Sequence, residues 1–180
     1  MLNVGIDYSL TCPAICVYWG TQTDPKPKDC SFHYLTKTAK LIGDFGNFHG
    51  TEYPKWDHPH ERYHAIAMWA IDAMRKGRKD YTDTPTIWIE NYGFNANGRI
   101  TDLAEHTGVL KQHLWKMGLP YKSVSIGSVK KILTGSGTAS KEEIGKVWRK
   151  EIPTGFPVGK SPSSDCIDAY GVLLAGMDSL

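Results

Sequence analysis

The sequence contains only four cysteines, and no two of them have the C-x-x-C spacing that is common in zinc sites. Cys12 and Cys16 lie in one apolar run, and Cys166 stands between apolar residues. Together with Cys30, they are expected to be buried, reduced thiols. The cysteine pattern therefore excludes a disulfide scaffold and argues against a zinc centre.

The sequence also lacks features of membrane insertion, export and nucleotide binding. No run approaches the roughly 18 apolar residues of a membrane span, and the first ten residues carry an acid at Asp7 without the basic lead-in of a signal peptide. No glycine-rich P-loop is present. We therefore expect a cytoplasmic protein without a nucleotide cofactor. With 180 residues, of which 41% are hydrophobic, a single domain spanning residues 1–180 is expected.

The net charge is small, but the charged residues are unevenly distributed along the chain. The formal net charge is +2, yet residues 111–160 carry ten basic and three acidic groups, a net of +7, and residues 161–180 carry three acids. A basic block before an acidic end suits a surface that holds phosphates beside a site that holds cations. Lysines that coat exposed helices would give the same pattern, so charge alone does not decide.

The hydrophobic periodicity predicts a mixed α/β domain. Three short β-rich runs come first and predict an antiparallel meander, and two further strands are expected at residues 86–90 and 121–126. Helices are expected at about 60–76 and 100–117, then as a short helix, a helix capped by Ser140 and a last helix beginning at Pro162. Residues 41–58 are rich in Gly, Asn, His and Pro and are interpreted as a loop or insertion. The pattern predicts a five-stranded mixed sheet, three strands antiparallel and two parallel, with helices on both faces.

Four carboxylates stand at chemically suggestive places. Asp7 ends the first strand, Glu90 ends the fourth, and Asp165 and Asp168 lie one helical turn apart on one face of the last helix. Singly, each has an ordinary explanation: a paired core charge, an exposed strand end, or acids that offset a helix dipole. Together they could hold two Mg²⁺ or Mn²⁺ ions, which would activate a water and steady the leaving oxygen of a phosphodiester.

Four segments, in this order, resemble the RuvC family of Holliday-junction resolvases: GID at Gly5–Asp7, IE at Ile89–Glu90, VKKILTGSGTASK at Val129–Lys141 and DCIDA at Asp165–Ala169. The resemblance spans nearly the whole chain. It implies a ribonuclease-H-like fold, a homodimer, and paired symmetrical cuts in four-way DNA. It also implies Asp7, Glu90, Asp165 and Asp168 as metal ligands and catalytic residues.

The same resemblance assigns basic positions to Lys130, with Lys131 as the alternative, and to Lys141. Lys141 is expected to stabilise the phosphate under attack or to neutralise the strand being cut, and so joins the catalytic residues. Lys130 would contact the DNA backbone as a point charge. The competing interpretation is that these lysines are solvated side chains on a helix surface.

The loop after Glu90 supplies further candidate DNA contacts. In the family an aromatic residue of this loop stacks on bases near the branch point, and Tyr92 and Phe94 offer such rings here. Phe94 could instead pack under its own loop. Asn95 and Arg99 are expected to contact phosphates.

The helix at 100–117 is the expected dimer surface. Leu103, Leu110 and Leu114 lie on one side of it and could meet their symmetry mates, or they could be buried against the chain's own sheet.

Some features depart from the family. Asp7 is followed by Tyr8, Ser9 and Leu10, where many members have Pro-Gly, which suggests a divergent, phage-type branch acting in a bacterium or an infected cell. Y-forks and flaps thus join four-way junctions as expected substrates. Two other functions stay open: a non-catalytic protein that binds branched DNA on the same fold, and a single-lobe ATPase-like domain.

A histidine cluster precedes and enters the first expected helix. His60 and His64 would share a helix face and could bind a transition metal, with His58 just before the helix. The simpler interpretation is that they are polar residues at a helix start, and that His113 is a surface helix residue.

Overall fold

The computed structural model describes residues 1–76, 84–91 and 100–179. Its centre is a seven-stranded mixed sheet with the strand order β4-β5-β3-β2-β1-β6-β7. The strands are β1 (Leu2–Asp7), β2 (Ala14–Trp19), β3 (Cys30–Thr36), β4 (Gly43–Phe45), β5 (Phe48–Glu52), β6 (Thr86–Glu90) and β7 (Tyr121–Val124). The helices are α1 (Pro59–Lys76), α2 (Ile100–Lys116), α3 (Ile126–Thr134), α4 (Lys141–Trp148) and α5 (Ser163–Asp178).

The strand pairing confirms the predicted meander and the two parallel strands. β1 pairs antiparallel with β2, and β2 pairs antiparallel with β3. On the other side of β1, β6 and then β7 add in parallel. The sequence-based expectation of a mixed α/β sheet is therefore confirmed.

The predicted strand number of five is wrong, because residues 41–58 are not simply a loop. They contain β4 and β5, and β5 extends the sheet in parallel beyond β3. Gly46, with φ at +66°, allows the tight turn between these two strands. Phe48 then stacks on Phe32 of β3, with 4.5 Å between the ring centroids, which anchors the added strand. Of the glycines that suggested a loop, Gly46 makes the hairpin turn, whereas Gly43 and Gly50 lie in the strands and pair with each other.

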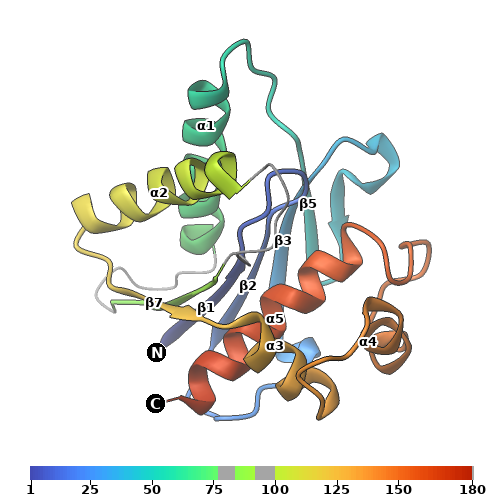
Figure 1. Ribbon diagram of the computed structural model, residues 1–180. Helices are drawn as coiled ribbons and strands as arrows, with labels where there is room; N and C mark the ends of the chain where they lie inside the picture. The colour runs from blue at the N-terminus through green and yellow to red at the C-terminus, as the bar shows by residue number, and fades with distance from the viewer. Residues whose placement is uncertain (77–83, 92–99, 180) are drawn as a thin grey trace.

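Helices cover both faces of the sheet, as expected (Figure 1). One face packs against α1 and α2 through a core that includes Ile6, Ile89 and Leu110. The other packs against α3, α4 and α5 through a core that includes Trp88 and Val172. Of these helices, α5 lies against β1 and β2, and it crosses the sheet in Figure 1.

The helix predictions agree closely with the observed bounds. The Ser140 cap is formed: its hydroxyl accepts from the backbone N–H of Glu143, and the Glu143 carboxylate accepts from the backbone N–H of Ser140. The four cysteines are buried and free, as predicted. Within the described ranges, no helix is long and apolar enough to cross a membrane.

Candidate active site

The side-chain alternation of two neighbouring strands brings Asp7 and Glu90 to the same face of the sheet. Ile6 in β1 pairs with Ile89 in the parallel strand β6, and both isoleucines point into the core beneath α1 and α2. The next residue in each strand therefore points to the opposite face, toward α5. Because parallel strands end on the same side, the two carboxylates lie at one edge of the sheet.

Helix α5 reaches this edge because glycines allow it to approach the strands closely. A Cβ atom on Gly5 of β1 would lie 2.3 Å from the carbonyl oxygen of Ala169 and 2.4 Å from the backbone nitrogen of Leu173. Further along, a Cβ atom on Gly176 would lie 2.3 Å from the indole of Trp88 in β6. The helix backbone thus rests directly on β1 and on the Trp88 ring. This contact sets the first turns of α5 over the strand ends.

The four predicted acids lie close enough to influence one another's pKa. Burial raises the pKa of Asp7 well above its usual value, and the charges of Glu90, Asp165 and Asp168 raise it further. Burial, and then the charge of Asp168, raise the pKa of Glu90 to about 7. Burial also raises the pKa of Asp168 to about 6, with a contribution from Asp165. The four acids therefore form one interacting group from β1, β6 and α5.

Asp165 is hydrogen-bonded by two nearby serines. It is 7% exposed, and burial raises its pKa, while hydrogen bonds from Ser161 and Ser164 act in the opposite direction. The Ser164 hydroxyl lies 3.3 Å from the carboxylate Oδ2. Neither serine was among the predicted site residues. Their signal was the S-P-S-S-D run that leads into the helix, where short hydroxyl side chains commonly bond nearby polar groups.

Two of the three predicted lysines lie beside the acids. The charge of Lys141 lowers the pKa of Asp7, Glu90, Asp165 and Asp168, and Lys141 lines a small pocket together with Asp168. Lys141 is the first residue of α4, so the Ser140 cap helps to fix its position. Lys130 in α3 lowers the pKa of Glu90 and Asp168.

Lys131 lies elsewhere. It is exposed and lines a separate groove with residues from the end of α5, among them Ala175 and Asp178. Between the two alternatives left open by the sequence, the structure therefore brings Lys130, and not Lys131, toward the acids. Tyr92, Phe94, Asn95 and Arg99 lie outside the described residues.

The donor set suits a hard divalent cation. Four carboxylates supply oxygen ligands, which Mg²⁺ prefers, and burial is the main cause that raises the pKa of each of them. Across residues 1–76, 84–91 and 100–179, no group of three or more His, Cys, Asp or Glu side chains is arranged to hold a metal ion.

Comparison with solved structures identifies the fold. A RuvC of T. thermophilus in complex with a Holliday junction substrate superimposes with a TM-score of 0.62 and 17% identity, over 97% of this chain and 92% of that chain. The chain has the RuvC fold. A second Thermus thermophilus RuvC structure gives a TM-score of 0.57 and 18% identity over the same shares of the two chains. No protein-family model and no curated protein matches the sequence.

Helix α2 differs from the expectation for a RuvC-like dimer surface. Leu110 and Leu114 are fully buried in the chain's own core, so they cannot meet symmetry mates, and Leu103 is only partly buried. The heptad-like spacing arose because these leucines pack against α1 and the sheet. The exposed side of α2 instead carries Trp115, whose side chain is 74% exposed.

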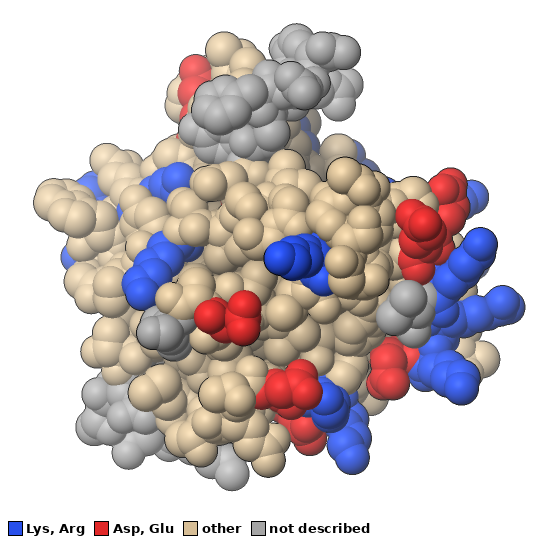
Figure 2. Space-filling view, turned by 60° about the horizontal axis from the view of Figure 1, so that its bottom comes forward, with Lys and Arg blue, Asp and Glu red and all other residues tan. Residues whose placement is uncertain are grey.

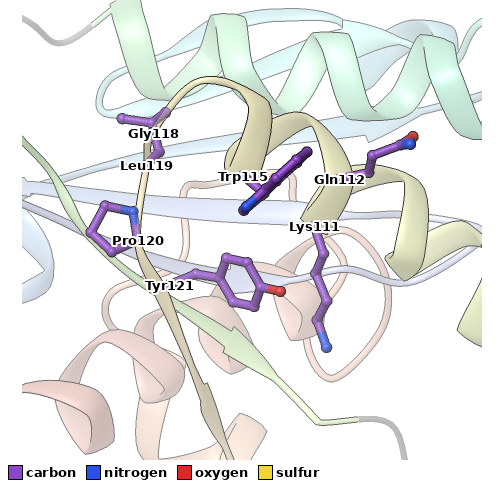
Figure 3. Close-up of a pocket in the computed structure, with 7 residues that line it drawn as sticks. All are labelled: Lys111, Gln112, Trp115, Gly118, Leu119, Pro120 and Tyr121. Atoms are coloured by element: carbon purple, nitrogen blue, oxygen red, sulfur yellow. The ribbon is translucent and has the colours of Figure 1, made fainter.

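Trp115 stands beside a groove at the end of α2 (Figure 3). The groove has a volume of about 670 Å³ and is lined by Lys111, Gln112, Trp115, Gly118, Leu119, Pro120 and Tyr121. The Lys111 ammonium lies 5.7 Å from the centroid of the Tyr121 ring. Tyr121 begins β7 and pairs with Ile87, whereas Glu90 pairs with Val124 at the far end of that strand. The groove is therefore at the other end of β7 from the acids.

The surface charge is mixed on the face shown in Figure 2. Lys and Arg side chains stand there in separate groups, with Asp and Glu side chains among them. This face therefore presents no single continuous basic surface. Lys130 and Lys141 lie near the acids and mark a candidate phosphate site there. The net charge of the chain does not locate such a site.

Proposed function

We propose that this protein is a metal-dependent endonuclease that hydrolyses phosphodiester bonds in branched DNA, with four-way junctions as its main substrate and Y-forks and flaps as further ones. The observation that supports the proposal is the electrostatic coupling of Asp7, Glu90, Asp165 and Asp168 to one another and to Lys141. The similarity to a RuvC in complex with a Holliday junction substrate supports the class of DNA.

In this proposal the four acids hold two Mg²⁺ ions, with Mn²⁺ as a substitute. The ions, when bound, supply Lewis-acid activation of the attacking water and charge neutralisation at the leaving oxygen. Asp7 and Glu90 are fixed by the sheet, and Asp165 and Asp168 by the turn of α5, so the ligands come from rigid elements.

The lysines have distinct proposed roles. Lys141 places a positive charge next to the acids, where it would stabilise the negative charge that builds up on the phosphate. Lys130, on the side of Glu90 and Asp168, would hold the neighbouring backbone phosphate. Contacts from Lys131, Tyr92, Phe94, Asn95 and Arg99 to DNA stay predictions.

We further propose that the active form is a homodimer, because two symmetrical cuts need two sites. The outer side of α2 is the proposed contact, with Trp115 replacing the buried leucines as its anchor. A large exposed ring beside a groove is suited to a two-fold interface, since each copy can place its indole against the other copy's groove.

The direct test is incubation of the protein with labelled four-way, Y-shaped, flap and linear DNA, with Mg²⁺ and with chelator. We expect cleavage of the branched forms only with metal, and Asp168→Asn should bind the junction without cutting it. If wild type and Asp168→Asn both bind the junction and neither cuts with Mg²⁺ or Mn²⁺, the protein is a non-catalytic junction-binding protein. ATP hydrolysis without DNA cleavage would instead support the ATPase-like alternative.

A further inference from the structure

Two histidines face each other where α1 packs against α2. The Nδ1 atom of His64 lies 3.2 Å from the Nε2 atom of His113, with the ring centroids 5.1 Å apart and the ring planes inclined by 49°. His64 is exposed and His113 is partly exposed, so the pair is open to solvent. Tyr63 and Leu114, the residues next to them in sequence, are buried: Leu114 lies in the core beneath α1 and α2, and the Tyr63 ring lies 5.3 Å from the ring of His106 in α2.

The distance between these nitrogens fits chelation of one metal ion. In a tetrahedral zinc site with Zn–N bonds of about 2.0–2.1 Å, two nitrogen ligands lie roughly 3.3 Å apart. Imidazole nitrogen is a preferred ligand for Zn²⁺, Ni²⁺ and Cu²⁺, provided the ring is neutral. Desolvation, together with the charges of His64 and Lys116, lowers the pKa of His113, which favours the neutral ring that binds metal. A plain hydrogen bond between the rings is the competing explanation of the contact.

We propose that His64 and His113 chelate one divalent transition-metal ion, with water completing its coordination, and thereby join α1 to α2. The site is separate from the carboxylate group, because α1 and α2 cover the face of the sheet opposite to α5. The two sites should also select different ions. Carboxylate oxygens suit Mg²⁺ and Mn²⁺, whereas an imidazole pair favours Cu²⁺, Ni²⁺ and Zn²⁺.

The test is titration of the full chain with Ni²⁺ and with Zn²⁺, followed by calorimetry and by the shift in Tm, in buffer that contains excess Mg²⁺. We expect one ion per chain and a rise in Tm. His64→Ala and His113→Ala should each weaken binding at least tenfold, about 1.4 kcal/mol, and abolish the rise in Tm. His60→Ala is the matched control, because it removes a histidine one turn earlier on α1, and its affinity should stay within about twofold of wild type.

A second readout separates this site from the acids. The electron paramagnetic resonance spectrum of bound Cu²⁺ should show splitting from two nitrogen ligands in wild type and in Asp7→Asn, and should lose it in His113→Ala. The unfolding curves of the metal-free variants show whether each alanine variant is folded. A wild-type Kd weaker than about 1 mM, equal affinity in wild type and His113→Ala, or an equal loss in His60→Ala would each overturn the assignment.

Discussion

Removing one charge from the acid group should stabilise the metal-free protein at neutral pH, and Glu90→Gln is the substitution that shows this best. The folded state raises the pKa of Glu90 from an ordinary 4.5 to about 7, chiefly through burial and then through Asp168. A group with a raised folded-state pKa binds more protons when folded, so its ionisation destabilises the protein as pH rises from the unfolded to the folded pKa. This destabilisation by ionised Glu90 is absent below about pH 4.5 and complete above about pH 7.

The size of the effect follows from the shift. At about 1.4 kcal/mol per pKa unit, the rise of the Glu90 pKa from 4.5 to about 7 lowers the free energy of unfolding by about 3 kcal/mol above pH 7. This is an upper limit, because Glu90 is only partly buried and solvent screens its charge.

The assay is chemical unfolding in chelator at pH 4.5 and pH 8, with wild type, Glu90→Gln and the control Glu105→Gln, an exposed acid of α2. Glu90→Gln should gain stability over wild type at pH 8 and little at pH 4.5, while the control should match wild type at both. Excess Mg²⁺ should stabilise wild type more than Glu90→Gln. If Glu90→Gln were no more stable than wild type at pH 8, the electrostatic description of the acid group would be wrong.

Three further predictions address packing, chemistry and assembly. Gly5→Ala should destabilise the protein by about 3 kcal/mol or more in chemical unfolding, because the added Cβ meets the α5 backbone. The control Gly127→Ala should be neutral or stabilising, because its Cβ would have only a side-chain oxygen nearby, at 3.9 Å. Equal losses of stability in the two variants would contradict the close approach of α5. Lys141→Ala should lower the single-turnover rate of junction cleavage about 10²–10³-fold, and Lys131→Ala should change it little; similar rates in both variants would remove Lys141 from the site. Trp115→Glu should convert a dimer to a monomer in light scattering, and a variant that stays dimeric would move the interface elsewhere.

Most of the fold could be predicted from the sequence, because apolar residues recur at the spacing typical of strands and of helices. The strands β1 and β6 and the apolar stripe of α1 follow directly from those periods, whereas the pairing of β1 with β6 does not. The hairpin of β4 and β5 could not be predicted, since β4 has only three residues and its stability comes from ring contacts with Phe32 and Phe156, which are distant in sequence.

The acids of the candidate site could be proposed from the sequence, but their surroundings could not. The spacing of Asp165 and Asp168 already places them on one helix face, and strand-end positions suggest Asp7 and Glu90. The choice between Lys130 and Lys131 depends on how α3 is rotated against α5, which a helical period alone does not fix. Likewise, Leu110 and Leu114 give the same spacing whether they face a partner or their own core.

A structure of crystals soaked in Mn²⁺, with an anomalous difference map, would test the convergence of the acids most directly. We expect strong peaks among Asp7, Glu90, Asp165 and Asp168, within ligand distance of their carboxylate oxygens, and their loss in Asp168→Asn. A map without peaks at this position at saturating Mn²⁺, while the four acids keep only protein partners, would contradict the proposed metal-dependent nuclease.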